Sequence, residues 1–166
     1  KWTEPWCATE LRCVMSYLYT TRKWTLKFTH CGEGREDLWL SIYADAGECG
    51  NDDEDGRPGR AVSGYFLVLE GANGAYLPLG RLSKRQTVPT TSSGEAEAIA
   101  WCTAAKAGMK VASMLELLRR SPITVRGFVD NEALRISILH GSSQRMGHLK
   151  KLAGVHFGVL QASLLI

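Results

Sequence analysis

Residues 38–45 read LWLSIYAD and alternate between two faces. This pattern is typical of a β-strand with one side turned to the core. The residues expected on one face are Leu38, Leu40, Ile42 and Ala44, and those expected on the other are Trp39, Ser41, Tyr43 and Asp45. The stretch therefore predicts one strand of a sheet, and its last residue is a carboxylate.

Working outward, residues 61–70 and 75–82 predict two more strands, which would form an antiparallel meander with the first. Residues 92–120 are apolar and rich in alanine. They predict a long helix, with Ser92 and Glu95 as a capping box and Pro122 just beyond its end. The other expected elements are a helix at 8–21, a linker at 29–37, a strand at 123–130, a helix at 131–140, and a helical tail from Gln144 with interruptions at Gly154 and Gly158.

This order of elements predicts an α/β fold with a mixed sheet, in which an antiparallel meander is followed by helix–strand–helix and helices lie on the sheet faces. The long helix would be the crossover that makes strand 123–130 parallel to a meander strand. The 166 residues, 45% of them hydrophobic, suit one domain with a sizeable core.

Composition and sequence patterns argue against several classes of protein. The longest nearly unbroken apolar stretch, residues 96–105, falls short of the roughly 20 residues of a membrane span, and no signal peptide is evident. Five cysteines without a close CxxC pair argue against a disulfide framework or a zinc site and favour a reducing compartment. Residues 1–60 carry a net charge of −3 and residues 61–166 one of +6, which alone decides nothing about partners.

Three carboxylates are candidates for chemistry. Asp45 and Asp130 each end a predicted strand, and parallel neighbours would bring both to one sheet edge, where open α/β sheets bind ligands. Close like charges repel unless a cation neutralises them or one of the two is protonated. The alternative is structural, with Asp45 in a turn and Asp130 capping a helix. Glu97 lies among apolar residues, so it either faces solvent or has a partner such as a metal ion.

Five runs of residues, in this order, carry a resemblance to a known family: Tyr43-Ala-Asp45-Ala, Ser63-Gly-Tyr65, Ser83-Lys-Arg-Gln86, Thr91-Ser-Ser-Gly-Glu95-Ala-Glu97 and Val129-Asp130-Asn131. They resemble the ribonuclease H domain of copia-type retrotransposon polyproteins over about residues 38–148. The N-terminal helix resembles the segment that joins reverse transcriptase to ribonuclease H there. The resemblance thus implies a connector at 1–37 and a ribonuclease H-like domain at 38–166, truncated at its C-terminus. The chain starts at Lys1 and ends on an apolar tail, so we expect a piece of a longer polypeptide.

The resemblance implies a mixed sheet of up to five strands and cleavage of the RNA strand of RNA–DNA hybrids with two Mg²⁺ or Mn²⁺ ions. It assigns the metal ligands to Asp45, Glu97 and Asp130, and it adds His148 as a catalytic candidate that is otherwise a surface residue. Nucleic-acid contacts are expected from Lys84, Arg85, Asn131 and Arg145, although a solvated basic face is the default. The implied partners are the hybrid and a reverse transcriptase domain. The implied location is the cytoplasm, in a retrotransposon particle, or the nucleus.

Departures from the family pattern leave a second reading open. Lys150 stands where the family has a fourth carboxylate, and there it would weaken the second metal site or pair with the other acids. Gly47 replaces the second aspartate of the first run. The chain would then be a ribonuclease H-like module that binds nucleic acid or serves a structural role without cutting, or another nuclease of the same fold. Trp39 and Trp101 are expected in the core. The acidic loop Asn51–Gly56 lacks the glutamate of a calcium loop, because Val62 is at its twelfth position.

Overall fold

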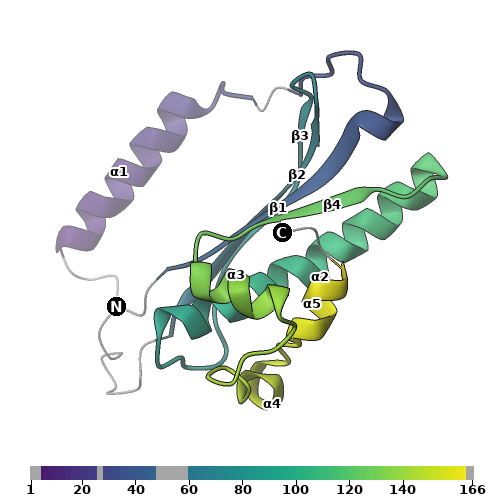
Figure 1. Cartoon of the computed structure of the whole chain (residues 1–166). Coiled ribbons are helices and arrows are strands. Elements are labelled where there is room, and N and C mark those ends of the chain that lie inside the picture. The colour runs from purple at the N-terminus through teal and green to yellow at the C-terminus, as the bar shows by residue number, and fades with distance from the viewer. Residues whose placement is uncertain (1–4, 26–27, 48–59, 164–166) are drawn as a thin grey trace.

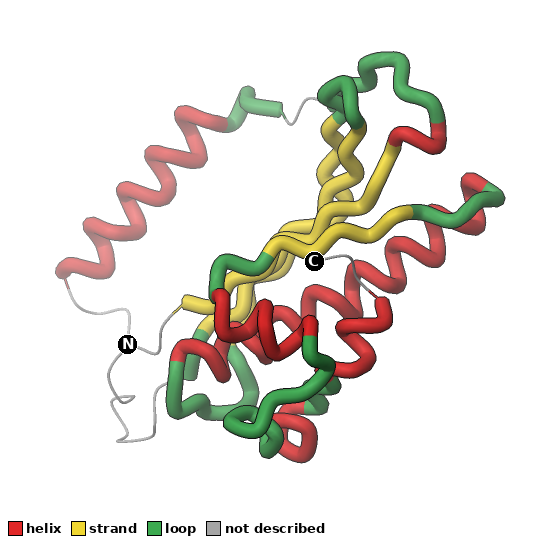
Figure 2. Tube along the Cα trace, viewed as in Figure 1, coloured by secondary structure: helices red, strands yellow, loops and turns green. Residues whose placement is uncertain are grey.

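The computed structural model describes residues 5–25, 28–47 and 60–163. Its centre is a four-stranded sheet in the order β3-β2-β1-β4 (Figure 1). The strands are β1 (Leu38–Gly47), β2 (Val62–Gly71), β3 (Tyr76–Arg85) and β4 (Thr124–Phe128). In Figure 2 they form one twisted sheet, with the long helix α2 running across one face of it.

The pairing of the strands confirms the predicted topology. β1 pairs antiparallel with β2, and β2 pairs antiparallel with β3 across an irregularity between Leu67 and Val68. β1 pairs parallel with β4, with Tyr43 opposite Phe128. The mixed α/β sheet with an antiparallel meander followed by helix–strand–helix is the ribonuclease H-like fold predicted from the sequence. Within the described residues the sheet has four strands, not five.

The crossover helix α2 (Ser93–Arg119) begins and ends where the sequence indicates. The Ser92 hydroxyl accepts a hydrogen bond from the backbone N–H of Glu95, which is one half of the predicted capping box. Arg120 ends the helix in a left-handed conformation, two residues before Pro122. Trp101 of this helix is buried together with Leu40 and Ile42 of β1, so the core lies between α2 and the sheet.

Gly108 allows α2 to approach β1 closely. A Cβ atom at this position would overlap the side chain of Ile42, with Cγ1 only 3.0 Å away. Ile42 is fully buried, so its side chain has little room to move. Gly94 in the first turn of the same helix has no atom within 4 Å of a corresponding Cβ.

The C-terminal helices are α3 (Glu132–Leu139), α4 (Leu149–Ala153) and α5 (Phe157–Ser163). They lie on the α2 side of the sheet (Figure 1). The predicted interruption at Gly154 is confirmed, because this residue ends α4 in a left-handed conformation. The predicted interruption at Gly158 is wrong: α5 runs through it. A Cβ atom on Gly158 would meet the Gly141 carbonyl at 3.6 Å, which is an ordinary van der Waals contact, so the packing here does not require a glycine.

The N-terminal helix α1 (Pro5–Thr21) lies apart from the other helices (Figure 1). Its predicted apolar face is exposed: between 52% and 58% of the residue surface is accessible to solvent for Leu11, Val14, Met15 and Leu18. The predicted linker is partly ordered by a β-bridge between Thr29 and Tyr76 and by the short helix η1 (Arg35–Asp37). No helix among the described residues is long and apolar enough to cross a membrane.

Two further sequence predictions concern individual side chains. Trp101 is in the core, as predicted, but Trp39 is only partly buried. Arg126 lies over the Trp39 ring at 3.8 Å from its centroid, because both residues lie on the sheet face away from α2. The acidic loop Asn51–Gly56 lies outside the described residues.

The substitution Gly108→Ala tests the close approach of α2. Alanine favours a helix over glycine by up to about 1 kcal/mol, whereas overfilling a packed core costs about 1–3 kcal/mol. We expect a net loss of about 1 kcal/mol in the free energy of unfolding, measured by urea denaturation. Gly94→Ala is the matched control and should be neutral or slightly stabilising. Equal stability of both variants would contradict the packing argument.

Candidate active site

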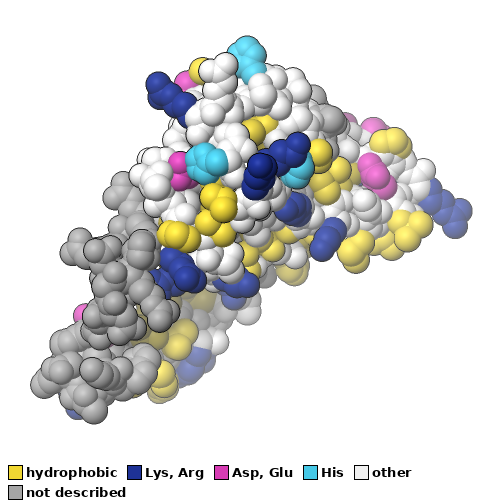
Figure 3. All heavy atoms as spheres, turned by 90° about the horizontal axis from the view of Figure 1, so that it is seen from below, with side chains coloured by type: hydrophobic (Ala, Val, Ile, Leu, Met, Phe, Trp, Pro, Cys, Tyr) yellow, Lys and Arg dark blue, Asp and Glu magenta, His cyan; other side chains and the backbone are white. Residues whose placement is uncertain are grey.

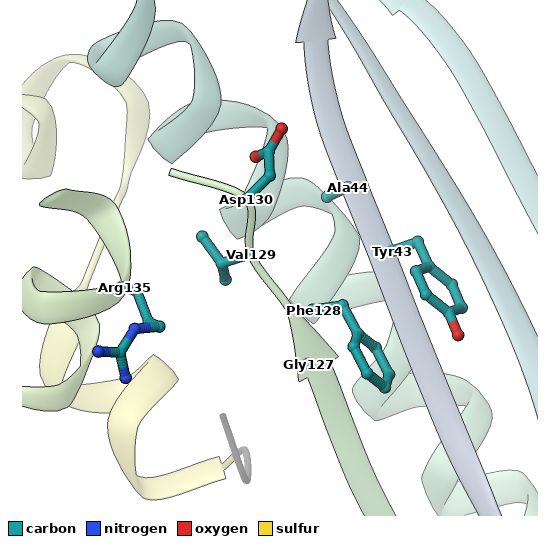
Figure 4. A pocket seen from close by; sticks show the side chains of 7 residues that line it. All are labelled: Tyr43, Ala44, Gly127, Phe128, Val129, Asp130 and Arg135. Atoms are coloured by element: carbon teal, nitrogen blue, oxygen red, sulfur yellow. The ribbon is translucent and has the colours of Figure 1, made fainter. Parts of the chain in front are cut away.

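The parallel pairing of β1 and β4 places two aspartates at one edge of the sheet. Tyr43 and Phe128 are register partners, and Asp45 and Asp130 each follow two residues later. Both aspartates are exposed. In Figure 4 the Asp130 side chain lies beside β1 at the end of β4. The prediction that Asp45 ends its strand is wrong, because Asp45 lies within β1 opposite Gly64 of β2. Both carboxylates nevertheless lie just beyond the last residue pair of β1 and β4, in the same direction along adjacent strands.

Glu97 completes the group from α2. Desolvation raises its pKa, the charge of Asp130 and then that of Asp45 raise it further, and a hydrogen bond from Asn131 lowers it. Its Oε2 atom is buried and has no hydrogen-bond partner among the described residues. Glu97 thus faces the two aspartates and not open solvent, which favours the partner hypothesis over the solvent one.

The chemistry of this group fits a hard divalent cation, although the three carboxylates do not enclose one. Carboxylate oxygens are the ligands that Mg²⁺ prefers, and an unpartnered buried oxygen is an unused ligand. Within the part of the chain that the structure describes, no three His, Cys, Asp or Glu residues are placed to hold one metal ion. The assignment of Asp45, Glu97 and Asp130 as metal ligands therefore stays a prediction.

Asn131 links two elements at this edge. Its Oδ1 accepts a hydrogen bond of 3.0 Å from the backbone N–H of Leu134 and so caps α3. Its side chain is also hydrogen-bonded to Glu97, which leaves the amide nitrogen as the donor. Asn131 was predicted as a nucleic-acid contact; in the structure it caps α3 and lies close enough to Glu97 to lower the pKa of that carboxyl.

His148 contacts an acid, Glu95, that was not among the predicted site residues. Its Nε2 lies 3.3 Å from Oε1 of Glu95, and its side chain is 47% exposed. Glu95 is buried and accepts hydrogen bonds from the backbone N–H and the hydroxyl of Thr91. The predicted capping box is thus only half formed, since this carboxylate reaches Thr91 and not Ser92. The contact of Glu95 with His148 could not be predicted from the sequence, because the two residues are 53 positions apart.

The predicted basic contacts lie on the surface in separate places. Lys84 and Arg85 end β3, and Arg145 lies between α3 and α4; all three are exposed. The face in Figure 3 has scattered Lys and Arg side chains with histidines and hydrophobic residues among them. Lys150 is exposed on α4 and forms no ion pair with any acid in the described ranges. The alternative in which Lys150 pairs with the site carboxylates is therefore not observed.

An aromatic pair that the sequence analysis missed lies next to the carboxylates. The rings of Tyr43 and Phe128 stack with centroids 4.7 Å apart and planes inclined by 11°. Both line a pocket of about 410 Å³ that Asp130 and Arg135 also line (Figure 4). Burial raises the pKa of Tyr43, and the charge of Glu70 adds to this. The signal was present in the sequence, because each aspartate follows an aromatic residue by two positions.

The comparisons with known proteins give structural neighbours only. No protein-family model and no curated protein matches this sequence. The chain is similar to RNase H1 from the halophilic archaeon Halobacterium salinarum NRC-1, with a TM-score of 0.45, 17% identity, and coverage of 75% of this chain and 78% of that chain.

The chain is also similar to the protease-reverse transcriptase of Prototype Foamy Virus. The TM-score is 0.46 with 13% identity over 86% of this chain, which spans 19% of the viral chain. A CSH mutant of the same viral protein gives a TM-score of 0.47 with 14% identity over 84% of this chain and 18% of that one. These scores leave the function to be argued from the residues of this chain.

Replacing Glu97 tests the electrostatics of the group. A carboxyl whose pKa is raised in the folded state stabilises the fold at low pH and loses this contribution as the pH rises through the folded pKa. The Glu97→Gln variant has no titrating carboxyl at this position, so it does not lose this stability as the pH rises. Without divalent cations it should therefore exceed the wild type in free energy of unfolding at pH 7 by roughly 0.5–1 kcal/mol. The two proteins should be equal near pH 4 in urea denaturation.

Glu132→Gln provides a control of opposite sign. A hydrogen bond from Arg135 lowers the pKa of Glu132, so this variant should be less stable than the wild type at pH 7. If Glu97→Gln also lowers stability at pH 7, the two aspartates do not repel Glu97 as described.

Proposed function

We propose that this chain is a metal-dependent endonuclease that cleaves the RNA strand of RNA–DNA hybrids. The observation that carries the proposal is the convergence of Asp45 and Asp130 at one sheet edge, with Glu97 close enough for both charges to raise its pKa. Carboxylates that repel one another are stabilised by protonation of one of them or by a bound cation, and the proposal takes the cation. A nucleic-acid phosphate, itself an anion, would be held there only through such cations.

The roles of the residues follow from their positions. Asp45, Glu97 and Asp130 would hold two Mg²⁺ or Mn²⁺ ions, which supply activation of the attacking water and stabilisation of the leaving oxygen. Asn131 orients Glu97 through its amide. Phosphates on either side of the cut would be contacted by exposed basic residues such as Lys84, Arg85 and Arg145, with His148 on the same substrate. Contact with the RNA 2′-hydroxyl would distinguish RNA from DNA.

The setting of this activity is part of the proposal. Sequence runs similar to those of copia-type polyproteins favour a retrotransposon origin, with a reverse transcriptase domain as a partner in the same polyprotein. Removal of the RNA template during reverse transcription would be the task. It would take place in a cytoplasmic particle or in the nucleus.

A second candidate is a ribonuclease H-like module that binds nucleic acid without cutting it. Two observations favour it: the described acids and histidines do not enclose a single metal ion, and a lysine is present at position 150. Binding would then rest on the basic surface alone, and it would fall steeply with salt and be insensitive to the carboxylates.

The decisive assay uses a labelled RNA–DNA hybrid with Mg²⁺ or Mn²⁺. We expect cutting of the RNA strand only, its loss in EDTA, and a decrease of about 100-fold or more in Asp45→Asn, Glu97→Gln and Asp130→Asn. Double-stranded DNA of the same sequence should stay intact.

Asp37→Asn is the matched control, because this exposed aspartate lies just before β1 at the opposite end of the strand. It should cut like the wild type. Hybrid binding without cutting, unaffected by the three carboxylate substitutions, would support the binding module and overturn the nuclease.

A further inference from the structure

Glu95 is a buried carboxylate that holds residues from two parts of the chain. It is 8% exposed in the first turn of α2. It accepts a hydrogen bond of 2.8 Å from the Thr91 backbone N–H and one of 3.0 Å from the Thr91 hydroxyl. On its other side His148 Nε2 lies 3.3 Å away. None of the roles argued above for the site carboxylates includes Glu95.

Capping of α2 does not require His148. The Ser92 hydroxyl already accepts the Glu95 N–H, and the negative charge of Glu95 at a helix N-terminus is favoured by the backbone dipoles. The contact with His148 therefore adds a connection between α2 and the segment before α4. Such a buried acid with a partly exposed partner fixes the position of that partner.

The segment that His148 ends is attached to the rest of the domain mainly through its apolar residues. Met146 is 9% exposed and Leu149 is 1% exposed, both within the core cluster. Arg145 and the imidazole of His148 lie on the outside, and among the described residues only Glu95 forms an ion pair with His148. Loss of this contact would free the polar side chains while Met146 and Leu149 keep the segment in place.

We infer that Glu95 is a positioning residue for substrate binding: it holds His148, and with it the turn that bears Arg145, against the end of α2 that carries Glu97. The inference rests on the proposed nuclease function. With Nε2 of His148 as the donor to Glu95, Nδ1 remains to accept a hydrogen bond from a substrate hydroxyl. Arg145 would contact a phosphate of the same strand. Glu95 itself would touch neither substrate nor metal.

A double-mutant cycle with Glu95→Ala and His148→Ala tests this inference. Each single variant should raise KM for the hybrid about three- to tenfold and leave kcat within about twofold, because substrate contacts are lost and the carboxylates are intact. The double variant should be no worse than His148→Ala alone, since the two residues act through one contact. Amide hydrogen exchange of residues 141–148 should be about fivefold faster or more in Glu95→Ala. Glu95→Gln keeps an acceptor oxygen in place and should retain most of the protection.

Glu33→Ala is the matched control for loss of a buried carboxylate. Glu33 is 7% exposed and accepts hydrogen bonds from the backbone N–H groups of Cys31 and Ala75, close to the start of β1. It should lower the melting temperature as Glu95→Ala does, yet leave KM and the exchange of residues 141–148 unchanged.

Two results would overturn the inference: unchanged exchange of residues 141–148 in Glu95→Ala, or effects of the two single variants on KM that multiply in the double variant. A wild-type chain that cuts no hybrid would overturn the proposed function instead. In that case the exchange measurement still decides whether Glu95 fixes the segment.

Discussion

The parallel pairing of β1 with β4 is the constraint on which the rest of the site depends. It sets Tyr43 opposite Phe128, and the same register carries Asp45 and Asp130 to one edge two residues later. No local preference of either aspartate would bring them together, since 84 residues separate them in the chain. Glu97 of α2 lies near both: desolvation raises its pKa, and the charges of Asp130 and Asp45 raise it further.

Helix α2 is the crossover that makes the pairing of β1 with β4 parallel, and it packs closely on the sheet. Its buried face is mostly alanine, with Gly108 at the nearest approach to Ile42, so the helix axis lies near the sheet. The helix also directs its two N-terminal acids, Glu95 and Glu97, to different sides. Glu95 and Glu97 are two positions apart, roughly 200° around the helix, so one faces Thr91 and His148 while the other faces the strand ends. One short stretch thereby links the segment before α4 with the carboxylate edge.

Local patterns in the sequence were enough to predict most of the helices and strands. Alternation predicted β1, the signals at Ser92 and Pro122 predicted the bounds of α2, and Asp130 lies two residues after the last residue of β4. The predictions that were wrong concern residues whose position depends on neighbours distant in the chain. Trp39 lies under Arg126 and not in the core, because only the pairing of β1 with β4 puts the two residues on one face. The contact of Glu95 with His148 has no local signal, as its two halves come from separate elements.

The place of Lys150 bears on how the site charges are balanced. A lysine among the three carboxylates would offset part of their charge and so reduce the need for a cation. In the structure Lys150 is exposed on α4, where it lines a pocket of about 460 Å³ with Phe157 and Gly141, and it pairs with no acid in the described residues. The charge of Asp45, Glu97 and Asp130 is therefore not cancelled by this residue. The departure at position 150 removes one possible ligand but does not fill the site, so the three carboxylates remain without a neutralising lysine among the described residues.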